Sequence, residues 1–270
     1  MEIGRKQVGN QTRIKNNRDK MSLIRAQNLD VSSVIHDKVK VTNGGAKKVL
    51  MKSNGGQIVM QLPRARVPFG LSCYESEKDA SIKKYSLEVS LGGTPQLDKF
   101  REVLEELDEY NVKTIADNCM PWLKENKSAL VIKEALYGPL IRPDKKGESP
   151  PRFKFKLPMW EGKPMFKVVD KDNNAIKLYD MVDGEPVVNW DWAQNGMEIT
   201  AIVECEGLWI VNKNVYCTWR AAKIKVNKSS GRNDFDFMDD EENDNEESQE
   251  TNDQEEEESI DDNESYEEED

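Results

Sequence analysis

The stretch "GLWIVNKNVYCTWRAAKIKV", residues 207–226, alternates apolar with polar or basic residues on both sides of a short polar break. Alternation with a period of two is typical of β-strands, and a polar break between two such runs predicts a β-hairpin. The apolar run continues upstream as "MEITAIVEC", which makes these the two longest expected strands. Aromatic and basic residues are interleaved along them, so the hairpin is also a candidate binding surface.

The charge of the chain is strongly segregated. Residues 234–270 hold 22 of the 51 acidic residues and none of the 39 basic ones, which leaves 29 acidic residues and a net charge of +10 for residues 1–233. The overall charge of -12 therefore hides a cationic body. Blocks of like charge with few apolar residues stay disordered and serve as interaction tails.

The rest of the body predicts a mainly β fold with one inserted amphipathic helix. An Asn54-Gly55 pair separates "KKVLMKS" from "QIVMQL", which is a strong hairpin signal. Thr94-Pro95 has the pattern of an N-cap followed by a first-turn proline, and apolar residues then recur at helical spacing to about residue 118. Strands return in "RFKFKLPMW" and continue to the hairpin. This order favours a β-barrel or sandwich with an inserted helix at about 94–118.

We expect three regions along the chain. Residues 1–25 are polar and basic at their start and predict a flexible N-terminal arm. Residues 26–230 predict the folded domain, and residues 231–270 the disordered acidic tail. No apolar run approaches the length of about 18 residues that a membrane-spanning helix needs, and the N-terminus lacks the apolar core of a secretory signal.

The sequence argues against an enzyme, a metal site and a cofactor. His36 is the only histidine, and the four cysteines show no CxxC spacing, which disfavours zinc and indicates reduced thiols in an intracellular compartment. The pattern GxxxxGK[ST] of phosphate-binding loops is absent. Most carboxylates lie in the tail, where burial cannot tune a pKa for catalysis.

Binding of single-stranded nucleic acid requires cations along the phosphate track and aromatic faces for unstacked bases. The C-terminal strands supply both types of side chain. Because one face of each strand must be core, the aromatic residues could equally be core residues, and a solvated surface would also explain the lysines. The candidate phosphate contacts are Lys154, Lys156, Arg220, Lys223 and Lys225, and the candidate stacking residues are Trp209, Tyr216 and Trp219.

The segments "PRFKFKLPMWEGKPMFKVVDKDNNAIKL" and "GMEITAIVECEGLWIVNKNVYCTWRAAKIKV", followed by a polyacidic end, resemble the acidic-tailed single-stranded-DNA-binding proteins of short-tailed bacteriophages. The resemblance is closer still to their counterparts in nucleocytoplasmic large DNA viruses. It covers roughly residues 150–230 and is looser from 26 to 149. It implies an OB-fold-like barrel, sequence-independent binding of single-stranded DNA, homodimers, and recruitment of replication proteins (polymerase, helicase or primase) by the tail. Phage members end in an aromatic residue, whereas this chain ends in "SYEEED".

Two functions of different classes follow. The first is single-stranded DNA binding in viral DNA replication, recombination or repair, in the host cytoplasm or nucleus and without a membrane partner. The alternative is an acidic-tailed histone chaperone or another nuclear interaction protein, in which the tail binds basic proteins. That alternative leaves the charge of the body unexplained.

Overall fold

The computed structural model describes residues 23–76 and 79–227. The chain divides into two units, Met1–Ser230 and Gly231–Asp270. The predicted acidic tail lies outside the described residues, as do residues 1–22 of the predicted N-terminal arm. Leu23–Arg25, which the sequence analysis assigned to that arm, instead form strand β1 and pair in parallel with Val59–Gln61 of β7. The arm boundary at residue 25 is therefore wrong for these three residues, because they extend the sheet.

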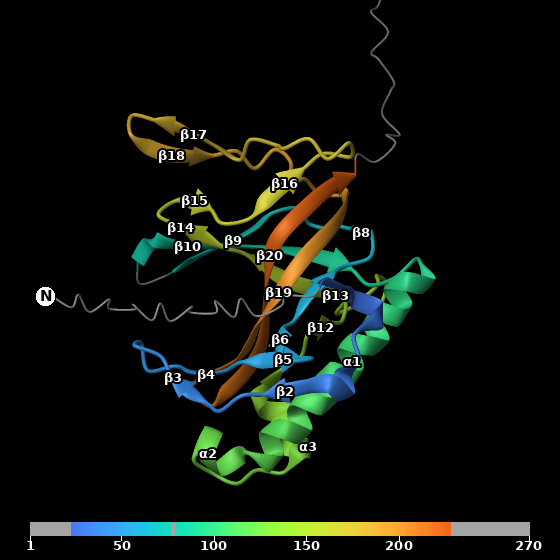
Figure 1. Ribbon diagram of the computed structural model, residues 1–270, viewed down its shortest axis with the longest axis vertical. Coiled ribbons are helices and arrows are strands. Elements are labelled where there is room, and N and C mark those ends of the chain that lie inside the picture. The colour runs from blue at the N-terminus through green and yellow to red at the C-terminus, as the bar shows by residue number, and fades with distance from the viewer. Residues whose placement is uncertain (1–22, 77–78, 228–270) are drawn as a thin grey trace, which may run out of the picture. The chain divides into compact units, whose positions relative to one another are not determined.

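The described residues are mainly β-strand (Figure 1). The strands are β1 (Leu23–Arg25), β2 (Val34–His36), β3 (Lys40–Val41), β4 (Lys47–Val49), β5 (Met51–Ser53), β6 (Gly56–Gln57), β7 (Val59–Gln61), β8 (Ala65–Arg66), β9 (Ser72–Ser76), β10 (Asp79–Ser90), β11 (Tyr137–Gly138), β12 (Ile141–Arg142), β13 (Arg152–Leu157), β14 (Met159–Trp160), β15 (Lys163–Pro164), β16 (Lys167–Val169), β17 (Tyr179–Val182), β18 (Glu185–Val188), β19 (Glu198–Val211) and β20 (Asn214–Asn227). The helical elements are the 3-10 helices η1 (Ala26–Asn28) and η2 (Val31–Ser33), the α-helices α1 (Pro95–Asp117), α2 (Cys119–Leu123) and α3 (Ala129–Val131), and the π-helix η3 (Ile132–Leu136).

The predicted hairpin is the centre of the fold. β19 and β20 pair in an antiparallel ladder over their full length. They form the middle of a sheet whose strand order within the described residues is β1-β7-β19-β20-β13-β10-β9. Short strands attach along both hairpin arms: β3, β4 and β8 on the side of β19, and β11 and β16 on the side of β20. In Figure 1 the two long orange strands run through the middle of the folded unit, between β17–β18 at one end and α2–α3 at the other.

One face of the sheet packs on α1. The helix begins where the sequence predicts, since the Thr94 side chain accepts a hydrogen bond from the Leu97 amide and Pro95 occupies the first turn. Its apolar side is buried, and the Phe100 ring meets that of Phe153 on β13 edge-on at 5.5 Å between centroids. Phe153 in turn contacts Trp219 on β20. The mainly β class with an inserted amphipathic helix is thereby confirmed.

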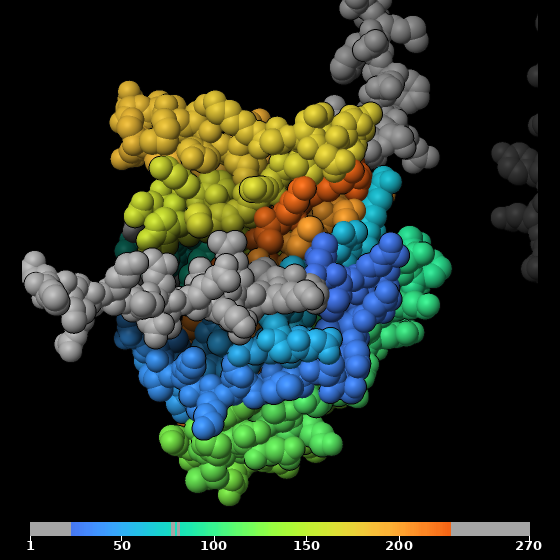
Figure 2. All heavy atoms as spheres, in the orientation of Figure 1, coloured from blue at the N-terminus to red at the C-terminus, as the bar shows by residue number. Residues whose placement is uncertain are grey.

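Smaller elements close the two ends of the unit. Asn54 and Gly55 both have positive φ angles and join β5 to β6, which confirms the hairpin predicted there. The small two-stranded sheets β14–β15 and β17–β18 lie at the end drawn in yellow in Figure 2, and α2 and α3 lie at the opposite, green end. No helix among the described residues is long and apolar enough to cross a membrane.

Candidate nucleic-acid interface

The face of the sheet opposite α1, here called the outer face, carries the candidate site. On β20 the side chains of Cys217, Trp219 and Ala221 are buried, whereas Tyr216 and Arg220 are exposed. The register with β19 then shifts: Ala221 pairs with Val203, but Lys223 pairs with Ile202. Ala222 is the extra residue of this β-bulge. Because the bulge reverses the alternation, Lys223 and Lys225 emerge on the same face as Tyr216 and Arg220.

A second bulge does the same for β19. Cys205 pairs with Trp219 and Gly207 with Thr218, so Glu206 is the extra residue. Gly207 has a φ of +96°, and a Cβ at this position would lie 2.2 Å from the carbonyl oxygen of Val49. Only glycine fits this backbone and this close approach of β4. The bulge turns Trp209 to the outer face, directly opposite Tyr216.

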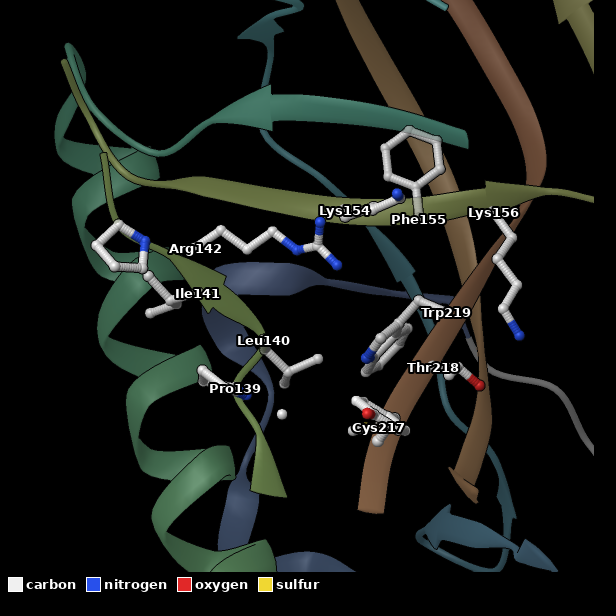
Figure 3. Close-up of a pocket in the computed structure, with 13 residues that line it drawn as sticks. Pro139, Leu140, Ile141, Arg142, Lys154, Phe155, Lys156, Cys217, Thr218 and Trp219 are labelled. Carbon is white, nitrogen blue, oxygen red and sulfur yellow. The ribbon is translucent and has the colours of Figure 1, made fainter. Parts of the chain in front are cut away.

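A groove opens on the outer face because β13 and β20 separate. The two strands pair only at Lys156 and Arg220, and the segment from β11 to β12 fills the bottom of the gap. The groove has a volume of about 380 Å³, within the range of about 300 to 1,000 Å³ that is usual for ligand sites. Its lining residues, most of them labelled in Figure 3, are Gly138, Pro139, Leu140, Ile141, Arg142, Pro143, Lys154, Phe155, Lys156, Tyr216, Cys217, Thr218 and Trp219.

Tyr216 provides the exposed aromatic surface of the groove. Its side chain is 45% exposed. Gly138 of β11 pairs with it in register, and a Cβ on Gly138 would lie 2.5 Å from the Tyr216 Cδ1 atom. The absence of a side chain at residue 138 therefore lets the ring lie against the groove wall. A planar, partly exposed ring beside an apolar groove is the arrangement on which an unstacked base can stack.

Lys154 is the free cation at the edge of the groove. It forms no ion pair or hydrogen bond with the part of the chain that the structure describes. Burial and the nearby positive charge of Arg142 lower its pKa, and the carboxylate of Glu88 opposes them only in part. Figure 3 shows the Arg142 guanidinium extending toward the β13 side of the groove, where Lys154 starts. Arg142 itself pairs with Glu88, at 3.0 Å, so of these two cations it is Lys154 that lacks a carboxylate partner among the described residues and favours an anion.

Lys156 and Arg220 lie at the closed end of the groove, and both are paired with carboxylates of β19. The Lys156 Nζ lies 2.7 Å from Glu206 Oε2, which also accepts a hydrogen bond from the Thr218 hydroxyl. Arg220 donates from both Nε and Nη2 to Glu204 Oε2, at 2.9 and 2.7 Å. Burial acts to raise the pKa of Glu206, but its bonds with Lys156 and Thr218 and the charges of Lys156 and Lys48 outweigh it, and the pKa is lowered.

Two further lysines continue the cationic surface along β20. Lys223 is exposed and lies directly opposite the exposed Lys167 of β16. Like charges in register repel each other, so this pair is also favourable for an anion. Lys225 donates a hydrogen bond to the Asn173 side chain, at 3.2 Å, and has no carboxylate partner within residues 23–76 and 79–227. We call Lys154, Lys156, Lys167, Arg220, Lys223 and Lys225 the cationic track.

The two tryptophans of the predicted site have different surroundings. Trp219 is 1% exposed and packs on Phe153, so the prediction that it can stack on a base is wrong: the alternation of β20 points it into the core. Trp209 is half-buried on the outer face. The Nζ atoms of Lys48 and Lys156 lie 4.8 and 5.8 Å from its ring centre, so lysines already use this π-surface.

The structure adds residues that the sequence analysis missed. Lys48 and Lys167 join the site through strand pairing with β19 and β20, which their positions in the sequence do not reveal. Gly138 and Arg142 belong to the short strands β11 and β12, in a segment whose sequence carries no recognisable motif. A signal for the bulge at Ala222 was present, since the apolar positions change from odd numbers up to Ala221 to even numbers from residue 224.

The described residues contain no cluster of three or more His, Cys, Asp or Glu side chains that could hold a metal ion.

No family model matches the chain, and no curated protein matches it. Among solved structures, the chain is similar to the single-stranded DNA-binding protein from bacteriophage Enc34 in complex with ssDNA, with a TM-score of 0.40, 9% identity, and coverage of 72% of this chain and 93% of that one. It is also similar to gp2.5, a single-stranded DNA binding protein encoded by bacteriophage T7, with a TM-score of 0.41, 9% identity, and coverage of 68% and 92%. Likenesses of this size do not assign the chain to a family.

Proposed function

We propose that the protein binds single-stranded DNA without sequence preference, along the cationic track and the groove beside Tyr216. The observation that carries this proposal is the combination of an exposed aromatic ring with unpaired cations on one face of the sheet. Tyr216 lies in the groove together with Lys154, and Lys223 and Lys167 continue the positive charge beyond it. Non-specific binding of single strands depends on this pairing of stacking surfaces and phosphate-binding cations.

The candidate residues have distinct roles in the proposal. Lys154, Lys156, Arg220, Lys223 and Lys225 contact phosphates, as the sequence predicts, and Lys167 joins them. Tyr216 stacks on a base. Trp209 supports Lys48 and Lys156 through its ring and reports binding by its fluorescence. No residue of this interface has a catalytic role, and the site needs no metal or cofactor.

The proposal is tested by titrating the full-length protein with oligo-dT, the same length of duplex DNA, RNA of matching sequence, and core histones. We expect the single strands to bind more tightly than the duplex. The logarithm of the affinity should fall linearly with the logarithm of the salt concentration, because bound phosphates release counterions. Preference for duplex DNA, or binding of histones alone, would refute the proposal. Histone binding alone would instead favour the histone chaperone, which rests on the acidic tail.

The wider biological role rests on the sequence resemblance. We propose an OB-fold-like domain at 26–230 that acts in viral DNA replication, recombination or repair inside the host cell. Its acidic tail, residues 231–270, competes with DNA for the cationic body and recruits a polymerase, helicase or primase. The resemblance also favours a homodimer and a relationship to large DNA viruses. The charge difference between residues 1–233 and 234–270 supports the competition, because a polyanion and a single strand attract the same cations.

A further inference from the structure

Two carboxylates lie inside the cationic track, where a nucleic-acid interface gains nothing from negative charge. Glu204 and Glu206 project from β19, next to β20, and pair with Arg220 of β20 and Lys156 of β13. Their side chains are only 14% and 20% exposed, whereas those of their partners Arg220 and Lys156 are 44% and 50% exposed. The carboxylates therefore lie beneath the cations, and solvent reaches mainly the cations.

The contacts of these carboxylates use the donors that a phosphate would need. Arg220 turns its Nε and Nη2 edge to one oxygen of Glu204, and this edge is the fork that normally binds a phosphate through two hydrogen bonds. Lys156 and Thr218 both bond to one oxygen of Glu206. In this arrangement the two cations at the centre of the track are neutralised, while Lys154 and Lys223, which form no ion pair with the described residues, lie on either side of them.

We propose that Glu204 and Glu206 are built-in competitors of phosphate for Arg220 and Lys156, and that they limit the strength with which the protein holds a single strand. This inference rests on the proposed function and adds residues that set its affinity. A strand then binds first to the unpaired lysines, and it gains the central contacts only by drawing Arg220 and Lys156 away from their carboxylates. We expect the strand to dissociate quickly, because Glu204 and Glu206 remain close enough to re-form their ion pairs with Arg220 and Lys156.

The competition predicts that removing the negative charge of Glu204 or Glu206 should increase the affinity for single-stranded DNA. Glu206→Gln keeps an oxygen for Lys156 and Thr218 but removes the charge. If this frees one cation for phosphate, the slope of log affinity against log salt steepens by about 0.7, which corresponds to about eightfold tighter binding at about 50 mM salt and about fourfold at about 150 mM. Glu204→Gln should act in the same way through Arg220.

The experiment measures affinity for oligo-dT across a salt series, and the dissociation rate, for the wild type, Glu204→Gln and Glu206→Gln. Asp37→Asn is the matched control, because Asp37 forms a comparable ion pair with Lys52 at 2.9 Å on β5, outside the track, and its loss changes the net charge by the same amount. Thermal unfolding verifies that each variant is folded. Both carboxylate positions are tested, so that if one variant fails to fold, the other variant still tests the inference.

We expect tighter binding, a steeper salt slope and slower dissociation for both glutamine variants, and no such change beyond the general charge effect for Asp37→Asn. Equal affinities and slopes in the wild type and both variants would overturn the inference. Weaker binding by the variants would also overturn it, and would show that the carboxylates hold the cations in place for phosphate. Absence of oligo-dT binding by the wild type is a separate result, since it removes the proposed function itself.

Discussion

Tyr216 lies directly opposite Gly138 across the parallel pair β20–β11, and its ring occupies the space that a side chain at residue 138 would need. The Cδ1 and Cε1 atoms of the ring would lie 2.5 and 2.7 Å from a Cβ on Gly138. Real contacts of this kind do not occur, so one of the two groups must move. The side chain at residue 138 therefore determines where the Tyr216 ring can lie. Within the described residues, this is the only exposed ring that lines the groove.

Gly138→Ala should displace the Tyr216 ring from the groove wall and weaken oligo-dT binding. We expect a loss in the range of the stacking contribution of one base, about 1 to 3 kcal/mol, as long as the fold is kept. Gly44→Ala is the matched control, because Gly44 has no atoms within 4 Å of a Cβ and no positive φ. Full affinity of Gly138→Ala would show that stacking does not depend on this ring position.

Tyr216 and Trp219 should respond in opposite ways to truncation. Tyr216→Ala removes an exposed ring and should lower the affinity for single strands by about 1 to 3 kcal/mol with little change in stability. Trp219→Ala removes a fully buried ring and should cost about 3 to 5 kcal/mol of unfolding free energy. Denaturant unfolding and binding titrations of both variants separate the two effects. Unchanged binding by a folded Tyr216→Ala protein would place base stacking elsewhere.

Loss of an unpaired lysine should change the salt dependence of binding. Lys154→Ala and Lys223→Ala should each lower the slope of log affinity against log salt by about 0.7, the value for one phosphate contact on a single strand. Lys113→Ala provides the control, since Lys113 is exposed on α1, which packs on the other face of the sheet. If the slopes of all three variants equal that of the wild type, the phosphates follow another path.

Asp108 should make stability depend on pH. Burial raises the pKa of its carboxyl to about 6, although bonds from the Tyr137 hydroxyl and the Leu140 amide lower it in part. A pKa raised by folding means that the protonated form is favoured in the folded state. The contribution of this group to stability is therefore fully present below its ordinary pKa of 3.8 and is lost as the pH rises through about 6.

The measurement is the free energy of unfolding of the wild type and of Asp108→Asn between about pH 4 and pH 7. Stability of the wild type relative to the variant should fall by roughly 2 to 2.5 kcal/mol over this window, because at about pH 4 the unfolded carboxyl is already partly ionised. Asp117→Asn, at the exposed end of α1, controls for loss of a surface carboxylate. A difference that is independent of pH would mean that Asp108 titrates in its ordinary range.

Deletion of residues 234–270 should tighten the binding of single strands, most clearly at low salt. The deleted segment carries 22 carboxylates over 37 residues, a charge density that competes for the same cations. Under the proposed competition, a flexible chain of this length would span roughly 30 to 35 Å, and tethering would give it an effective concentration of millimolar order. Salt should reduce the difference between full-length and shortened protein, because it screens charge attraction. Equal affinities at low salt would argue that the segment does not compete.

The sequence alone determined the fold class and the main elements. Local patterns sufficed for this: the Thr94-Pro95 start of α1, the Asn54-Gly55 turn and the two long alternating arms each depend on neighbours in the chain. Alternation also indicated that Tyr216 and Trp219 lie on opposite faces. It could not say which face is buried, because that depends on where α1 packs.

The tertiary structure alone decided how the candidate site is assembled. The bulges at Glu206 and Ala222 reverse the alternation and bring Trp209, Lys223 and Lys225 to the face of Tyr216. A bulge depends on how two strands meet, so it is a property of the pair and not of either strand. The groove exists because β13 and β20 separate beyond Lys156 and Arg220, and the carboxylates of β19 reach these cations only across strands. Pairing between distant segments therefore decides which charges are free.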